Sequence, residues 1–228
     1  LTRINEIGNP ALKCIMVSAY GDMRNIRSAM NNGAFDFATK PIDLEDLALT
    51  IEKAVEQIDF VKRSQQEHRQ LESIKSELVA AHEIQQTILP TNWTPSPDMQ
   101  GKISVFAYVQ PAKDLGGEFY DFFKIDDQRI GFVMADVSGK GLPAALFMAV
   151  SRTLMHSIGM TGCPTHECIA RTNRLLSLEN EKAMFVTMFY GILDLTTGVI
   201  SYTNAGHNPP YILHKDNTVT PLPKSGNM

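Results

Sequence analysis

Residues 130–148 read Ile130-Gly-Phe-Val-Met-Ala-Asp-Val-Ser-Gly-Lys-Gly-Leu-Pro-Ala-Ala-Leu-Phe-Met148. An apolar run ends at Asp136, and a turn with Gly139 and Gly141 leads into a helical run. A lone ionised carboxylate at the end of a buried strand is costly unless a cation or hydrogen bonds meet it. The glycines allow a sharp turn and the close approach of a ligand. The pattern predicts a carboxylate presented to a metal ion or a phosphate; the alternative is that Asp136 caps the following helix.

Composition places the chain among ordinary globular proteins. It has 228 residues, 43% hydrophobic and 20% charged, enough for one large domain or two modest ones. The net charge of -4, without a basic block, gives no reason to expect nucleic-acid binding. Three scattered cysteines do not suggest a disulfide framework, and no apolar run reaches the length of a membrane span. We expect a cytoplasmic protein with no membrane partner, and a chain that is cut at both ends.

The first part of the chain alternates β and α patterns. Residues 14–19 and 35–39 read as short strands, residues 22–32 read as a helix between them, and Asp43 reads as the N-cap of the next helix. Two parallel strands joined by a helix imply an open α/β sheet with its site at the carboxyl ends of the strands. Ser18 and Lys40 stand at two such ends.

This pattern resembles the C-terminal half of a response-regulator receiver domain over residues 1–58. The resemblance implies that Ser18 is the switch hydroxyl, that Lys40 is the lysine preceding a proline, and that an intact receiver has a cognate histidine kinase as partner. The phosphorylated Asp of that family lies on an earlier strand, which this sequence does not contain. We therefore expect that this chain does not accept the phosphoryl group.

A helical pattern continues from Leu44 to about Leu89, and it predicts a linker over residues 59–92. Apolar positions follow alternating spacings of three and four until two spacings of three, at Gln65, His68 and Leu71, produce a stammer. This pattern favours a homodimer formed through the linker helix; the alternative is an amphipathic helix packed on its own domain. The predicted seam is Leu44, Leu47, Ile51, Ala54, Ile58, Val61, Gln65, His68, Leu71, Ile74, Leu78, Ala81, Gln85 and Ile88.

Residues 93–228 mix strands and helices in an order that predicts an α+β domain. The predicted helices are residues 142–158 and 165–178, and the predicted strands are residues 103–109, 129–135, 188–194 and 199–204. The last two strands flank Thr196-Thr-Gly198 and predict a hairpin.

A second acidic cluster, Gly116-Gly-Glu-Phe-Tyr-Asp121, follows Pro111-Ala-Lys-Asp-Leu115. Oxygen ligands without histidine or cysteine select hard cations such as Mg²⁺ or Mn²⁺. Two such ions can activate a water for attack on phosphorus. The alternative is that Glu118 and Asp121 are solvated loop acids.

Other chemistries fit less well. Ser138-Gly-Lys-Gly141 lacks the spacing of a Walker A loop, and Ser138 lacks the elbow motif of a hydrolase nucleophile. Gly116-Gly-Glu-Phe119 is one acidic residue short of a cyclic-dinucleotide synthase signature. His207 could assist proton transfer, although Asn204-Ala-Gly-His-Asn-Pro-Pro210 also reads as a structural turn.

Four motifs together resemble the SpoIIE-type branch of the PPM family, the metal-dependent serine/threonine phosphatases of bacterial signalling. They are Ala81-His-Glu-Ile-Gln-Gln-Thr-Ile-Leu-Pro90, Pro111-Ala-Lys-Asp-Leu-Gly-Gly-Glu-Phe-Tyr-Asp121, Ala135-Asp-Val-Ser-Gly-Lys-Gly141 and Asn204-Ala-Gly-His-Asn-Pro-Pro210. The resemblance spans residues 80–228. It implies a β-sandwich flanked by helices, with a two-metal site between the sheets.

The resemblance also implies roles for single residues. Asp136 would bridge two Mn²⁺ or Mg²⁺ ions, the Val137 carbonyl would help to hold one ion, and Glu118 stands where the family has an Asp ligand. The candidates for substrate or phosphate contact are Lys113, Asp121, Gly139, Lys140, Gly141 and His207. The implied substrate is phosphoserine or phosphothreonine on a protein partner, typically a STAS-domain, anti-anti-sigma-like protein.

The sequence departs from this family after Asn208, where further metal-binding aspartates are expected and none matches. We therefore expect a PPM domain that is truncated at its C-terminus, and a chain that is weak or inactive by itself. The predicted function is a phosphoprotein phosphatase that an N-terminal receiver regulates through a helical linker. The alternative, favoured by Glu118, is a pseudophosphatase that binds and sequesters its partner.

Overall fold

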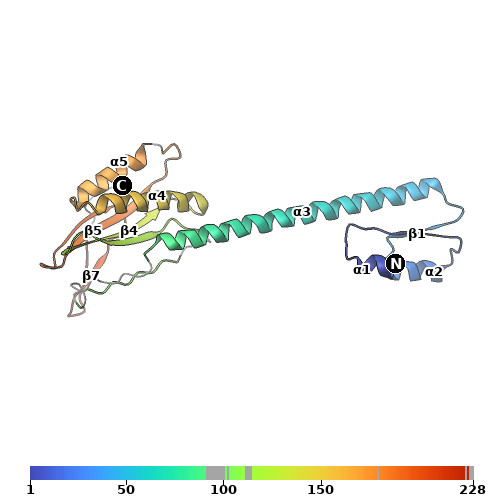
Figure 1. Ribbon diagram of the computed structural model, residues 1–228, viewed down its shortest axis with the longest axis horizontal. Coiled ribbons are helices and arrows are strands. Elements are labelled where there is room, and N and C mark those ends of the chain that lie inside the picture. Colours follow the sequence, from blue (N-terminus) through green and yellow to red (C-terminus); the bar gives the residue numbers. More distant parts are fainter. Residues whose placement is uncertain (91–100, 102, 111–114, 179, 224, 226–228) are drawn as a thin grey trace. The chain divides into compact units, whose positions relative to one another are not determined.

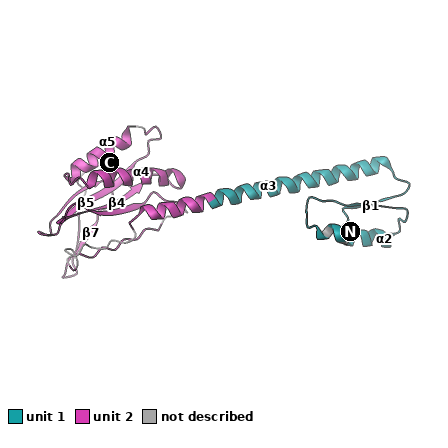
Figure 2. Ribbon diagram, viewed as in Figure 1, with its two compact units in different colours: residues 1–76 teal, residues 77–228 magenta. Residues whose placement is uncertain are grey.

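The computed structural model describes residues 1–90, 101, 103–110, 115–178, 180–223 and 225. The chain divides into two compact units, Leu1–Ser76 and Glu77–Met228 (Figure 2). One helix, α3 (Leu44–Ile88), contributes to both units, so their boundary falls inside the predicted linker. Within the described part of the chain, no helix is long and apolar enough to cross a membrane.

The first unit is a small α/β structure. After α1 (Thr2–Glu6), strands β1 (Ile15–Ser18) and β2 (Asp36–Thr39) pair in parallel, and α2 (Met23–Asn31) connects them (Figure 1). The predicted strand–helix–strand order is confirmed here. Asp22 caps α2 by accepting hydrogen bonds from the amides of Arg24 and Asn25.

Helix α3 is 45 residues long and follows the cap predicted at Asp43. The carboxylate of Asp43 accepts hydrogen bonds from the amides of Glu45 and Asp46 at 2.9 and 3.3 Å. Apolar residues in the middle of α3 stay exposed, with Leu71 at 66% and Ile74 at 55%. The helix ends at Ile88, just before Pro90, as proline requires.

The second unit is built on one antiparallel sheet in the order β3-β4-β5-β6. Its strands are Phe119–Lys124, Arg129–Val137, Val186–Asp194 and Ile200–Ala205. A separate hairpin consists of β7 (Tyr211–Leu213) and β8 (Val219–Pro221). The predicted hairpin around residues 196–198 is confirmed, whereas β3, β7 and β8 were not predicted.

The predicted strand over residues 103–109 is wrong. Residues 103–110 form neither a helix nor a strand. Ala107 and Val109 pack against the core, and Phe106 is 92% exposed. The alternating pattern therefore reports which side chains are covered, and such coverage does not require pairing in a sheet.

Helices α4 (Leu142–Gly159) and α5 (Thr165–Ser177) cover one face of the sheet; α4 packs on β3 and β4, and α5 packs on β5 and β6 (Figure 1). The core lies between these helices and the sheet and includes Phe119, Phe123, Val133, Met148, Met155, Cys168 and Tyr190. The predicted α+β class agrees with this mixed architecture.

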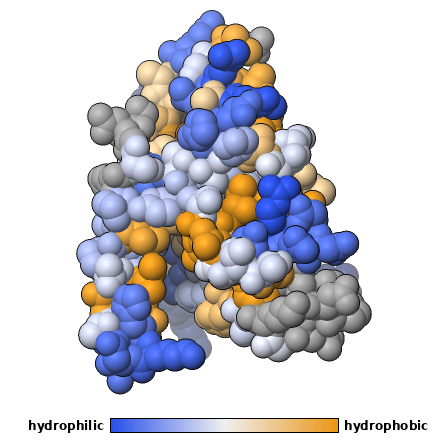
Figure 3. All heavy atoms as spheres, turned by 90° about the vertical axis from the view of Figure 1, so that its left-hand side faces the viewer, coloured by the Kyte–Doolittle hydropathy of each residue, from blue (hydrophilic) through white to orange (hydrophobic). Residues whose placement is uncertain are grey.

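The other face of the sheet carries a row of aromatic rings. Phe189 lies between Phe132 and Tyr202, with ring centroids 6.0 and 5.3 Å apart. In Figure 3, hydrophobic side chains also reach the surface of the second unit in patches between hydrophilic ones. Exposed apolar residues of the β7–β8 hairpin are Tyr211, Ile212, Leu213 and Val219.

Candidate metal centre

The structure brings Glu118 and Asp136 together at one end of the sheet. Strands β3 and β4 pair with Phe119 opposite Ala135, and one further step in this register sets Glu118 opposite Asp136. Paired residues share a face, so both carboxylates lie on the face that α4 and α5 do not cover. Partial desolvation of the Asp136 carboxylate raises its pKa, the charge of Glu118 raises it further, and the charge of His207 lowers it.

The two carboxylates have unused capacity for a cation. The Oε2 atom of Glu118 is buried and has no hydrogen-bond partner among the described residues. A buried, unpartnered carboxylate oxygen beside a second carboxylate fits a hard divalent ion, which supplies the missing positive charge. The pair stands alone, however: the described part of the chain holds no group of three or more acidic, histidine or cysteine residues arranged to bind a metal.

The structure excludes one of the two interpretations of Asp136, the helix cap. The N-cap of α4 is Gly141, which offers no side chain, and Pro143 occupies the first turn of the helix. Asp136 therefore does not cap α4. The sequence predicted a buried carboxylate at the end of the strand, but the structure shows that Asp136 is exposed. Because water still reaches the Asp136 carboxylate, leaving its negative charge unpaired costs less free energy than it would in the core.

The turn that follows Asp136 is tied to the start of β5. The amide of Ser138 donates to the Phe185 carbonyl at 2.8 Å, and the Phe185 amide donates to Ser138 Oγ at 3.0 Å. Gly139 and Gly141 have φ angles of 93° and 72°, which side chains other than that of glycine rarely adopt. Lys140 is exposed between them, so this turn presents a cation and open backbone beside the acidic pair.

A second glycine loop approaches Val137 closely. The Val137 amide donates to the Gly117 carbonyl at 3.3 Å. A Cβ atom on Gly117 would lie 2.8 Å from Val137 Cβ and 3.0 Å from the Val137 carbonyl oxygen. The loop therefore needs glycine at this position in order to place Glu118 beside β4.

His207 reaches the same end of the sheet through Thr187. Thr187 lies opposite Asp136 on β5, and its Oγ1 atom is 3.3 Å from the Asp136 carbonyl and 2.9 Å from His207 Nδ1. Burial lowers the pKa of His207, and the charge of Asp136 opposes this shift. Sequence reasoning missed Thr187, because only the register of β4 with β5 connects it to Asp136.

The structure does not bring Asp121 to this site. Asp121 is 2% exposed, and its carboxylate contacts Arg152 at 3.0 Å and His156 at 2.7 Å, both on α4. Successive strand residues alternate between faces, so Asp121 and Glu118 point to opposite sides of the sheet. Lys113 lies outside the described residues.

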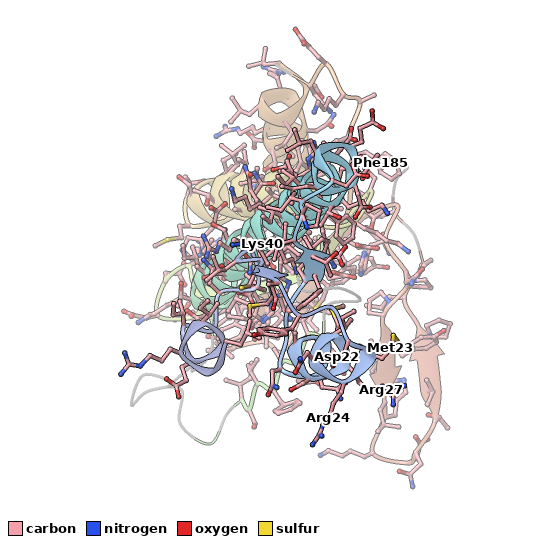
Figure 4. All side chains as sticks on the ribbon, turned by 90° about the vertical axis from the view of Figure 1, so that its right-hand side faces the viewer. Asp22, Met23, Arg24, Arg27, Lys40 and Phe185 are labelled. Atoms are coloured by element: carbon pink, nitrogen blue, oxygen red, sulfur yellow. The ribbon has the colours of Figure 1, made fainter. Side chains whose placement is uncertain are left out.

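In the first unit, Ser18 and Lys40 lie at the ends of their strands, as predicted. The Lys40 amide donates to the Ser18 carbonyl at 2.9 Å, and Ser18 Oγ accepts a hydrogen bond from the Tyr20 amide at 3.1 Å. Figure 4 labels Lys40 together with Asp22, the cap of α2. The role of this pair as a receiver switch stays a prediction.

Comparison with known proteins supports a phosphatase domain of the SpoIIE/PPM type in the C-terminal part. Residues 126–228 match the family model described as Stage II sporulation protein E (SpoIIE). The SiaA PP2C domain of Pseudomonas aeruginosa shares the fold, with a TM-score of 0.55 and 20% identity over 68% of this chain and 61% of that chain. The PPM phosphatase family is metal-dependent.

Two curated relatives are similar over longer stretches. Phosphoserine phosphatase RsbU of Bacillus subtilis (strain 168) is 35% identical over 187 residues, which cover 80% of this chain and 54% of that protein. Protein IcfG of Synechocystis sp. (strain ATCC 27184 / PCC 6803 / Kazusa) is 31% identical over 177 residues, which cover 66% of this chain and 27% of that protein. This chain thus spans about half or less of the length of these relatives.

Proposed function

We propose that this chain belongs to a signalling phosphatase that hydrolyses phosphoserine or phosphothreonine on a protein partner with the help of Mn²⁺ or Mg²⁺. The observation that carries the proposal is the pair Glu118 and Asp136, with a buried and unpartnered Glu118 oxygen, inside a domain of the SpoIIE/PPM type. The printed name of the relative RsbU, a phosphoserine phosphatase, supports the substrate class.

The carboxylates of Asp136 and Glu118 and the carbonyl of Val137 are the groups that would hold metal. Two ions are expected in a β-sandwich domain of this type. When bound, such ions supply a nucleophilic water at neutral pH and neutralise charge on the phosphoryl group.

The remaining residues serve the anionic substrate and the proton. The exposed Lys140 side chain would offer positive charge to a bound phosphoryl group. The backbone at Gly139 and Gly141, which no side chain covers, would offer N–H donors. His207 has a lowered pKa, which favours the neutral imidazole at pH 7. Its Nδ1 atom is engaged by Thr187, so Nε2 is the atom that accepts or donates the proton.

The regulation and setting of the enzyme belong to the same proposal. The substrate would be a small STAS-domain, anti-anti-sigma-like protein, and the location would be cytoplasmic. The first unit would be part of a receiver that a cognate histidine kinase phosphorylates. The linker helix α3 would carry the signal and form a homodimer.

A second candidate function is a pseudophosphatase, and Glu118 favours it. Glutamate keeps the charge of the family's aspartate but adds a methylene group, which alters the spacing between two carboxylates. Such a protein would bind its phosphorylated partner without hydrolysing it.

The test compares the natural protein that contains this sequence with its Asp136→Asn variant. We expect manganese-dependent release of phosphate from a phosphoserine protein, and a loss of at least about 100-fold in kcat/KM for the variant. Asp216→Asn is the matched control, because Asp216 is an exposed acid in the β7–β8 turn. Full activity of Asp136→Asn would disprove the metal site. Partner binding without turnover, together with no calorimetric binding of Mn²⁺, would favour the pseudophosphatase.

A further inference from the structure

The last turns of α3 hold the glycine loop through one buried side chain. Gln85 is 6% exposed, and its Nε2 atom donates to the Gly116 carbonyl at 2.6 Å. The Gly116 amide points back to Gln85 Oε1 at 3.4 Å. A single amide side chain thus meets both backbone polar groups of one residue, and all of these atoms lie within the second unit.

The identity of this residue needs an explanation, because it stands on the apolar side of the helix. Leu89, four residues further on and directly after the end of α3, is 4% exposed and belongs to the hydrophobic core. An apolar residue would fill the position of Gln85 without the cost of burying an amide. The motif that contains Gln85 is one of the four that resemble the phosphatase family. Gln85 is not among the proposed metal ligands, so its role needs another explanation.

Gly116 lies two residues before Glu118, so its position influences where the acidic pair lies. Gly117 follows and is held from the other side, where its carbonyl accepts the Val137 amide and its missing side chain leaves room for β4. Glu118 comes next, beside Asp136. The loop is therefore fixed at two consecutive residues, by α3 at Gly116 and by β4 at Gly117.

Fixing this loop opposes a repulsion. The β3–β4 register sets the carboxylates of Glu118 and Asp136 opposite one another, and like charges at paired positions repel. Without a cation, Glu118 would lower the energy of the chain by turning away from β4. The two hydrogen bonds between Gly116 and the buried Gln85 side chain resist that movement.

We propose that Gln85 is a positioning residue of the metal centre: by holding Gly116 it keeps the Glu118 carboxylate beside Asp136, ready for a divalent cation. The inference rests on the proposed function, and it concerns how the site is preorganised rather than which residues touch the metal. Groups that orient a metal ligand typically contribute 10- to 100-fold to metal affinity.

The experiment uses three variants of the full chain. Gln85→Glu keeps the shape of the side chain but cannot donate to the Gly116 carbonyl, and Gln85→Ala removes both hydrogen bonds. Gln86→Ala is the matched control, because Gln86 is the adjacent, half-buried glutamine and has no recorded side-chain hydrogen bond within the described ranges. Circular dichroism and urea unfolding establish that each variant is folded.

Two measurements are made on each variant. Amide hydrogen exchange in the metal-free chain follows the Gly116 amide, and titration calorimetry follows the binding of Mn²⁺. We expect faster exchange at Gly116 and a Kd for Mn²⁺ raised by about 10- to 100-fold in both Gln85 variants, with Gln86→Ala close to wild type.

The outcomes separate this inference from the proposed function. Wild-type binding of Mn²⁺ with unchanged affinity in folded Gln85→Glu and Gln85→Ala would overturn the role of Gln85 and leave the metal centre standing. An equal loss in Gln86→Ala would also overturn it, because the effect would then belong to the helix end in general. A wild-type chain that binds no Mn²⁺ would overturn the metal centre itself, and the role of Gln85 with it.

Discussion

At the scale of single residues, the core of the second unit leaves no room for one additional methyl group at Gly159. Gly159 lies in the last turn of α4, and a Cβ atom placed there would overlap the ring of Phe123. The Phe123 ring also meets His156 edge-on, with centroids 4.8 Å apart. The ring therefore has little freedom to retreat from a larger residue at position 159.

We predict that Gly159→Ala destabilises the protein, although alanine is the better helix former. Helix propensity favours alanine by about 1 kcal/mol, whereas overpacking a core costs about 1–3 kcal/mol. Urea unfolding should show a net loss of about 1 kcal/mol. In a Phe123→Leu background the same substitution should be neutral or stabilising, and stabilisation in the wild-type background would contradict the packing argument.

The residues of the candidate site could be predicted only where the neighbouring sequence itself carries the signal. Glu118 directly follows Gly117, Asp136 stands three residues before Gly139, and the structure brings the two acids together. Asp121 was placed with them because β3 was not predicted. Without that strand, nothing in the sequence showed that residues 118 and 121 face opposite sides of a sheet. Thr187 could not be predicted at all, since its position depends on pairing between distant strands.

At the scale of elements, a buried ionic cluster joins β3 to α4. Asp121 contacts Arg152 and His156, which lie one turn apart on the helix and are 18% and 31% exposed. An ionised carboxylate at this depth is tolerated only because both partners reach it. The cluster holds α4 against β3. It therefore connects the two elements that follow the Gly139–Gly141 turn and Glu118 in the chain.

We predict that Asp121→Asn destabilises the protein by about 3 kcal/mol, since it leaves the Arg152 guanidinium without a buried counter-charge. Chemical unfolding measures the loss. The control is Asp127→Asn, which removes the ion pair between Lys124 at the end of β3 and the exposed Asp127 just after it, and should cost less than about 1 kcal/mol. Adding Arg152→Met to Asp121→Asn should recover part of the stability. Equal effects of the two aspartate substitutions would refute the importance of burial.

The elements themselves were predicted where their signals are long. Helices α4 and α5 and the β5–β6 hairpin agree with the sequence within one or two residues, because helical periodicity and a Thr-Thr-Gly turn are local signals. The segment over residues 103–109 was misread because alternation records which side chains are covered, and a strand needs a hydrogen-bonded neighbour as well. That neighbour cannot be read from the segment.

At the scale of the whole molecule, α3 is continuous from Leu44 to Ile88 and serves both compact units. Its middle turns display apolar side chains of the predicted seam, with Leu71 66% and Ile74 55% exposed. Apolar residues repeated along one helix favour association with a second helix. The sequence predicted this seam, and its partner stays a prediction.

We predict that the chain is a dimer in solution and that Ile74→Glu shifts it toward the monomer. A charge in the seam would be buried against its symmetry mate, and the dimer Kd should rise by at least about 10-fold. Sedimentation velocity over a range of concentrations measures the shift. Ser73→Glu, which places the same charge beside the seam, should leave the dimer intact. A wild-type chain that is monomeric at all concentrations would disprove the dimer.

The reciprocal bonds between Ser138 and Phe185 have a mechanical consequence. They join the turn that carries Lys140 to the strand that carries Thr187, two residues beyond Phe185. The backbone segments that carry Lys140 and Thr187 are therefore tied together two residues away from each of these side chains. Under the proposed function, a phosphoryl group bound between Lys140 and His207 would meet two groups on a joined backbone, so that little backbone reorganisation would remain for the reaction.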